Sequence, residues 1–194
     1  MSNLENQHEI ARADRGEVSS SQSAEQSGSG KTANEIQIVV DSGQAQTSGN
    51  SMDLKQIMSI LPHRPPFLLI DKVTFYDGVN EARGLKNLTS GEFFFQNHFG
   101  DSPELPKPIL IEIMAQLGAV CVLNQPEYKG KLILFASIDD CTFGKAPVPG
   151  DVLDLRVENR GMRRGMGRML ASCYVDNELR AQGMLMFAIT EKEQ

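Results

Sequence analysis

The run from Ile109 to Leu123 constrains this chain most, because Glu112 is the only charged residue in it. The run is long enough for about four helical turns, and the preceding Pro108 suits the first turn of a helix. Apolar side chains lie on nearly every face of this predicted helix. Such a helix is stable in water only when other structure surrounds it. The rest of the chain must therefore cover one central helix.

A sheet is the predicted cover. Segments rich in strand-forming residues flank the apolar run, and residues such as Asp77-Gly78 and Asp176-Asn177 are typical of tight turns between strands. The predicted strands are 67–76, 81–88, 131–142, 152–158, 168–175 and 179–189. A short amphipathic helix is predicted over 53–60, before a group of prolines. We therefore expect an α+β fold in which a curved antiparallel sheet wraps around the central helix.

The composition changes at Met52. Residues 1–51 are rich in Ser, Gln and Gly and carry an excess of acidic side chains. They bury too little apolar surface to offset their conformational entropy. We predict a disordered tail over 1–51 and a folded domain over 52–194. Within the tail, the apolar run 36–40 is either a chance feature or a strand that pairs with a partner.

Several functional classes are disfavoured by composition. The net charge of −6 argues against a nucleic-acid partner. The sequence has no stretch of about 18 apolar residues, so no membrane helix is predicted. The N-terminus lacks the pattern of a secretion signal. We expect a cytoplasmic protein. Its three cysteines, Cys121, Cys141 and Cys173, are widely separated and predict neither a disulfide framework nor a metal site.

Two residues draw attention as candidates for catalysis. Glu112 places a carboxylate in a helix that should be buried, which is costly unless the group is paired, neutralised or used. A local opening or a structural arginine would explain it equally well. His98 lies in the aromatic stretch 93–99, and histidine is suited to proton transfer near neutral pH. A histidine in such a place is also typical of a hydrogen-bonded core residue.

The stretch from His98 to Gln116 resembles the signature H-F-P-G-x-P-x-x-P-G-V-L-x-x-E-A-M-A-Q without a gap. This signature belongs to bacterial 3-hydroxyacyl-[acyl-carrier-protein] dehydratases of the FabZ class. Further blocks of that family appear in the same order, and the resemblance spans residues 53–190. These blocks are 61–71, 86–89 with 94–96, 135–139 and 147–151.

The resemblance implies a hotdog fold and a dimer, often assembled as a trimer of dimers. It implies a (3R)-3-hydroxyacyl substrate on the phosphopantetheine arm of acyl carrier protein, a trans-2-enoyl product, and no further cofactor or metal. His98 would act on the proton at the α-carbon, and Glu112 of the other subunit would help the β-hydroxyl leave as water.

The resemblance also assigns residues around this pair. The backbone N–H of Lys107 would meet the thioester carbonyl oxygen at the helix start, where the helix dipole favours negative charge. Gln116 shares a helix face with Glu112, so it would orient the carboxylate or touch the acyl chain, or be a polar residue near the dimer seam. Gly100-Asp101 and Lys107-Pro108 depart from the family pattern, and lysine adopts a positive φ less readily than glycine.

Two further features have open interpretations. His63 matches the family, and as a loop histidine beside prolines it is interpreted as structural. Arg160, Arg163, Arg164 and Arg168 are either a solvated group on a hairpin or a surface that attracts an acidic carrier protein.

Three other functions compete with the dehydratase. A dehydratase that also isomerises the double bond usually has aspartate at the position of Glu112. A hotdog thioesterase would release a free acid and does not require both His98 and Glu112. A catalytically weak hotdog protein that binds acyl chains or a carrier protein would tolerate the altered segments.

Overall fold

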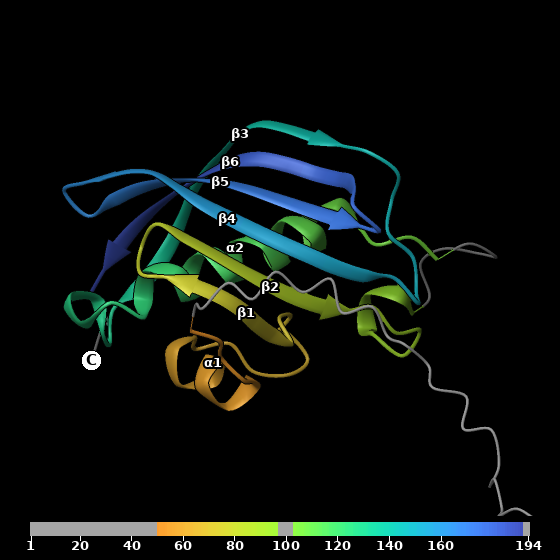
Figure 1. Cartoon of the computed structure of the whole chain (residues 1–194), viewed down its shortest axis with the longest axis horizontal. Helices are drawn as coiled ribbons and strands as arrows, with labels where there is room; N and C mark the ends of the chain where they lie inside the picture. Colours follow the sequence, from red (N-terminus) through yellow and green to blue (C-terminus); the bar gives the residue numbers. More distant parts are fainter. Residues whose placement is uncertain (1–49, 97–102, 192–194) are drawn as a thin grey trace, which may run out of the picture. The chain divides into compact units, whose positions relative to one another are not determined.

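The computed structural model describes residues 50–96 and 103–191, and a single long helix lies along one face of a six-stranded antiparallel sheet (Figure 1). The strand order is β1-β2-β4-β5-β6-β3. The strands are β1 (Lys72–Asp77), β2 (Glu81–Asn87), β3 (Leu132–Phe143), β4 (Val152–Arg163), β5 (Met166–Val175) and β6 (Glu178–Thr190). The helical elements are α1 (Leu54–Ile60), η1 (Phe93–Phe95), α2 (Lys107–Leu123) and η2 (Pro126–Tyr128).

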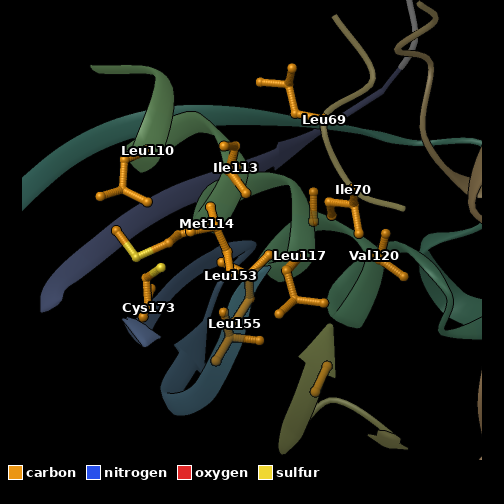
Figure 2. Packing of buried hydrophobic residues seen from close by; sticks show 14 of the residues in the cluster. Leu69, Ile70, Leu110, Ile113, Met114, Leu117, Val120, Leu153, Leu155 and Cys173 are labelled. Atoms are coloured by element: carbon orange, nitrogen blue, oxygen red, sulfur yellow. The ribbon is translucent and has the colours of Figure 1, made fainter. Parts of the chain in front are cut away.

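Helix α2 is the predicted central helix, and it begins two residues earlier than the apolar run. Pro106 is its N-cap residue and Pro108 lies in its first turn, where a missing N–H breaks no helical hydrogen bond. Leu110, Met114 and Leu117 are buried and point toward sheet residues such as Leu153, Leu155 and Cys173 (Figure 2). The prediction of a central helix covered by a sheet is confirmed, and the residues near its start, such as Ile111 and Ala115, remain partly exposed. No helix in the described ranges is long and apolar enough to cross a bilayer.

Helix α1 is stabilised locally by the hydrogen bonds at its N-terminus. The Asp53 side chain accepts a hydrogen bond from the Gln56 backbone N–H at 2.8 Å, and the Gln56 side chain accepts one from the Asp53 N–H at 2.9 Å. This capping box satisfies two donors that a helix start leaves without helical partners. Ile57 is the buried residue of α1 and marks the face that packs against the core.

Tight turns join the strands of the sheet. Asp176 and Asn177 both have positive φ, 51° and 64°, which matches the type I′ turn of a two-residue hairpin between β5 and β6. The predicted turn at this site is confirmed. The β4–β5 hairpin is longer than the predicted strands 152–158 and 168–175. Its turn is the pair Arg164-Gly165, with φ values of 54° and 76°, and it lies in the segment that the sequence analysis placed on a hairpin.

One strand prediction is wrong over part of its length. The strand expected over 67–76 starts only at Lys72. Leu68, Leu69 and Ile70 are buried, and the Leu69 N–H donates to the side chain of Gln116 on α2, not to a neighbouring strand. A run of apolar residues indicates burial but not the type of element, because a segment packed on a helix has the same apolar pattern as a strand.

The predicted tail over 1–51 lies outside the described residues, except for Asn50 and Ser51, which are exposed. The apolar run 36–40 is outside them as well. The folded part begins to pair at Met52, which exchanges backbone hydrogen bonds with Val73. The assignment of a disordered tail stays a prediction.

Candidate active site

Glu112 lies on α2 beside an open pocket of about 240 Å³ that is lined by α2, the sheet and the loop after α1. Its side chain is 30% exposed, so the expectation that this carboxylate is buried all round is wrong. Glu112 therefore faces a local opening, and its predicted catalytic role stays a prediction. The other walls of the pocket are mostly apolar and include Ala115, Ala119, Ile133, Leu185 and Phe187. The pocket thus has one polar end and an apolar interior.

Gln116 is buried and fixes the orientation of Glu112. Its Nε2 donates to Glu112 Oε1 at 2.9 Å and to the Phe67 carbonyl at 2.9 Å. Its Oε1 accepts from the Leu69 N–H at 2.9 Å. A side-chain amide with both ends bound cannot rotate without losing hydrogen bonds. The geometry therefore fits the predicted role of orienting the carboxylate.

His63 reaches the same carboxylate from the loop after α1. Its Nε2 lies 3.6 Å from Glu112 Oε1, and its side chain is 32% exposed at the pocket. The Arg64 guanidinium donates to the carbonyls of Leu61 and His63 at 2.8 and 2.7 Å, which holds the loop. The sequence interpretation of His63 as merely structural missed this contact. No periodic pattern links a loop residue to a helix so far along the chain; only its place in a family block marked it.

The departure from the family pattern at Lys107 suggested a strained backbone at the start of α2, which the structure does not show. Lys107 is helical and has no positive φ, so the absence of glycine causes no backbone strain. Its ammonium lies 5.2 Å from the centre of the Phe143 ring on β3, a cation–π contact. The N-cap residue Pro106 has no side-chain acceptor for the first-turn amides. The predicted contact of the Lys107 N–H with a carbonyl oxygen stays a prediction.

His98, Gly100 and Asp101 lie outside the described residues, so the predicted pairing of His98 with Glu112 stays a prediction. The described chain stops at Gln96, after η1, and resumes at Pro103.

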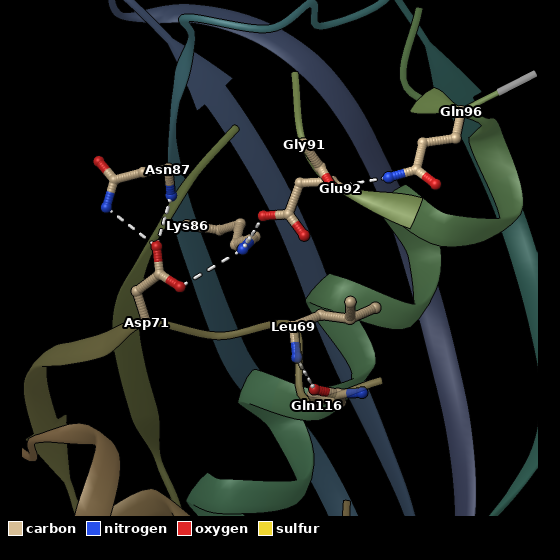
Figure 3. A network of polar contacts seen from close by, with 8 residues as sticks. All are labelled: Leu69, Asp71, Lys86, Asn87, Gly91, Glu92, Gln96 and Gln116. Atoms are coloured by element: carbon tan, nitrogen blue, oxygen red, sulfur yellow. Dashed lines mark hydrogen bonds and ion pairs between the residues drawn. The ribbon is translucent and has the colours of Figure 1, made fainter. Parts of the chain in front are cut away.

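A second polar network holds the chain just before that point (Figure 3). Lys86, with a side chain only 8% exposed, pairs with Glu92 at 2.6 Å and with Asp71 at 3.4 Å. Asp71 also accepts from the backbone and side-chain nitrogens of Asn87, at 2.7 and 2.9 Å. A buried ammonium is tolerated only when it is paired in this way. The network ties the segment after Leu69 to the turn that leads into η1.

One wall of the pocket includes a glycine of α2. A Cβ atom added at Gly118 of α2 would lie 3.0 Å from Met169 Sδ on β5. Both residues line the pocket, together with Leu185 and Phe187. A glycine inside a helix is unfavourable by about 1 kcal/mol relative to alanine, and here its lack of a side chain makes room for Met169. The close approach of α2 and β5 at Gly118 and Met169 therefore shapes one wall of the pocket.

The thiols take no part in this polar end. Cys121 and Cys173 are fully buried, and Cys141 is partly buried. Burial, aided by the charge of Asp77, raises the pKa of Cys121 to about 12. Burial, aided by the charge of Asp154, raises the pKa of Cys173 to about 12. These two thiols are packing groups, as small buried cysteines usually are.

The arginine group lies on the β4–β5 hairpin and not at the pocket. Arg160 pairs with Glu158 at 2.7 Å, while Arg163, Arg164 and Arg168 are exposed. This placement fits a solvated hairpin and leaves the carrier-protein contact a prediction. Within residues 50–96 and 103–191, no group of three or more His, Cys, Asp or Glu side chains is placed to hold a metal ion.

The chain is similar to known proteins in both sequence and structure. Residues 61–183 match the model of a FabA-like domain. The chain is similar to the 3-hydroxyacyl-[acyl-carrier-protein] dehydratase FabZ of Herpetosiphon aurantiacus, with 46% identity over 140 residues, which is 72% of this chain and 99% of that protein. It is 44% identical to FabZ of Desulforamulus reducens over 141 residues, covering 73% and 99%.

A solved structure confirms the architecture. The dehydratase heterocomplex ApeI:P of Xenorhabdus doucetiae matches with a TM-score of 0.60 and 20% identity, covering 70% of this chain and 91% of that one. At that identity the likeness speaks for the fold alone. The α+β hotdog fold expected from the sequence is confirmed.

Proposed function

This chain belongs to the FabA-like family, and we infer that it is a hydro-lyase that dehydrates (3R)-3-hydroxyacyl-[acyl-carrier-protein] to the trans-2-enoyl thioester in fatty-acid biosynthesis. One observation carries the assignment of the site to this reaction. Glu112 is a carboxyl group held at the polar end of an otherwise apolar pocket. An apolar pocket suits an acyl chain, and a carboxyl group in a fixed orientation suits proton transfer to the leaving hydroxyl.

The proposed reaction uses Glu112 as the acid and His98 as the base. His98 takes the proton from C2, and the electron pair of that C–H bond forms the C2–C3 double bond. The C3–O bond breaks as Glu112 gives its proton to the oxygen, which leaves as water with the bonding electrons. Hydroxide is a poor leaving group, so this proton is needed. The Lys107 N–H is proposed to stabilise negative charge on the thioester carbonyl oxygen.

A dimer is proposed on the evidence of β3. This strand is one edge of the sheet, and it exposes Leu134, Phe135 and Ile138 at 56%, 43% and 41%. A long apolar edge strand is a hazard in a monomer and is normally covered. Pairing of two β3 edges would cover it, and the meeting of His98 from one subunit with Glu112 of the other is carried over from the family. A trimer of such dimers is proposed by carry-over from the family.

We propose acyl carrier protein as the partner and the phosphopantetheine arm as the only prosthetic group involved, with no cofactor or metal of the protein's own. A cytoplasmic location is proposed with it, because that is where the family's substrates are made. The Arg163–Arg168 end of the β4–β5 hairpin is a candidate surface for an acidic carrier protein.

The decisive experiment offers the purified protein a 3-hydroxyacyl carrier-protein thioester and identifies the product. The dehydratase gives the 2-enoyl thioester, an isomerising enzyme gives the 3-enoyl thioester, a thioesterase gives the free acid, and a binding protein gives none. Glu112→Gln and His98→Ala should each lower the dehydration rate by about 10²-fold or more. A variant of either residue with near-normal dehydration would refute its proposed role.

A further inference from the structure

His63 and Gln116 approach the same oxygen of Glu112 from two elements. The Gln116 amide donates to Oε1 at 2.9 Å from one helical turn away, and His63 Nε2 faces Oε1 at 3.6 Å from the loop after α1. The His63 distance is longer than a hydrogen bond and within the range of a close polar contact. Contacts of this kind are often long in an empty site and tighten when the substrate is bound.

The other nitrogen of His63 decides where the ring carries its proton. Nδ1 is buried and has no hydrogen-bond partner. An N–H group at Nδ1 would be a buried donor without an acceptor, which is energetically costly. A buried Nδ1 lone pair without a donor costs less. The geometry therefore favours the tautomer with its N–H at Nε2, directed at Glu112.

This arrangement makes the two carboxyl oxygens of Glu112 unequal. Two N–H donors face Oε1, so an acid proton placed on Oε1 would point toward other hydrogens. The proton therefore belongs on Oε2. When Oε2 gives it to the leaving oxygen of the substrate, negative charge develops on the carboxylate, and the donors at Oε1 stabilise that charge.

We propose that His63 is a positioning residue that holds Glu112 Oε1 through its Nε2–H and so presents Oε2 as the acid that protonates the departing hydroxyl. The proposal rests on the proposed dehydratase function and goes beyond it, because His63 neither removes the α-proton nor gives a proton to the substrate. Its effect is confined to the breaking of the C3–O bond.

The test compares two substrates that differ only in the leaving group. A 3-hydroxyacyl thioester needs the proton from Glu112, whereas a 3-fluoroacyl thioester of the same length expels fluoride, a far weaker base than hydroxide. Elimination from each thioester is followed by formation of the enoyl product. His63→Ala should lower kcat on the 3-hydroxy substrate about tenfold or more, with little change in KM, and lower kcat on the 3-fluoro substrate about threefold at most.

Two companion variants sharpen the result. His63→Gln keeps an N–H donor of similar reach and should recover most of the lost kcat, while His63→Leu fills the same space without a donor and should not. Ser59→Ala, at the exposed end of α1, changes a hydrogen bond in the same region without touching the carboxyl group and should leave both rates unchanged. If His63→Ala does not fold, the contrast between His63→Gln and His63→Leu carries the test.

Equal losses on the two substrates would show that His63 supports only the fold, and an unimpaired His63→Ala would refute the proposal outright. Impairment of His63→Gln as severe as that of His63→Leu would refute the donor role. The proposed function fails separately: in that case the wild type makes no enoyl product and Glu112→Gln changes nothing.

Discussion

The two ends of α2 are built on different principles. From Leu117 to Leu123 every residue is buried, and the helix is held by packing against strands β2, β4 and β5 (Figure 2). Near its start, Glu112 is partly exposed and its orientation depends on hydrogen bonds from Gln116 and on His63. The apolar end determines where the helix lies. The polar end determines how one carboxyl group points.

This difference predicts that stability and activity respond to different substitutions. Packing energies are distributed over many contacts and do not select the direction of a side chain. Hydrogen bonds contribute less to stability but have strict geometry. Substitutions along α2 therefore separate the two effects, and Gln116, at the junction, should show both.

The largest effect on stability is expected at the apolar end. Leu117→Ala removes a fully buried side chain that touches the backbone region of Gly84, and it should lower the free energy of unfolding by about 2–5 kcal/mol. Denaturant unfolding at fixed protein concentration measures the change. The control is Leu54→Ala on α1, where the leucine is 44% exposed. Equal losses in the two variants would mean that the apolar end is not the main support.

A smaller loss, accompanied by lost activity, is expected at the junction. Gln116→Leu leaves the Leu69 N–H, the Phe67 carbonyl and Glu112 Oε1 without their partner. It should lower the unfolding free energy by about 1–3 kcal/mol and reduce kcat for dehydration about tenfold, because the carboxyl group is no longer oriented. Unfolding and steady-state kinetics are measured on the same sample. Normal kcat in a destabilised variant would contradict the orienting role.

The raised pKa values of the buried thiols predict that the free energy of unfolding falls at high pH. Burial raises the pKa of Cys121 and of Cys173 to about 12, against an ordinary value near 9. Between these values the folded chain keeps protons that the unfolded chain loses, so stability is full below pH 9 and falls as the pH rises. From pH 8 to pH 10 the unfolding free energy should drop by about 1 kcal/mol for each thiol.

The control for the thiol prediction is the double variant Cys121→Ala with Cys173→Ala. Its unfolding free energy should depend less on pH over the same range, measured in the same buffers. An identical pH dependence in the two proteins would assign the effect to other groups.

The smallest change in stability is expected from Gly118→Ala. Alanine is the better helix residue by about 1 kcal/mol, and the new Cβ meets only the flexible end of Met169. The two effects should nearly cancel in denaturant unfolding. The narrowed pocket should raise KM for long acyl chains relative to short ones. Gly84→Ala is the contrasting variant, since its Cβ would lie 3.0 Å from the Lys72 carbonyl, which cannot move aside.

Local patterns predicted much of the fold. The apolar run predicted α2 because its side chains need cover whatever surrounds them, and Asp176-Asn177 predicted a hairpin because those residue types accept positive φ. The segment 67–71 was mistaken for a strand, since packing on α2 and pairing in a sheet give the same apolar pattern. The hairpin of the arginine group was anticipated, but its strands were predicted too short, because glycines such as Gly161 and Gly167 weaken the strand pattern near the turn.

By itself, the sequence determined the central helix, the sheet that covers it and the one carboxyl group that breaks the apolar run. These follow from hydrophobic periodicity and from the cost of burying charge, which are local properties of the chain. Only the tertiary structure decided that Glu112 faces a pocket and that Gln116 and His63 share its Oε1 atom. Those contacts join residues up to 49 positions apart, and no local pattern specifies which distant side chains meet.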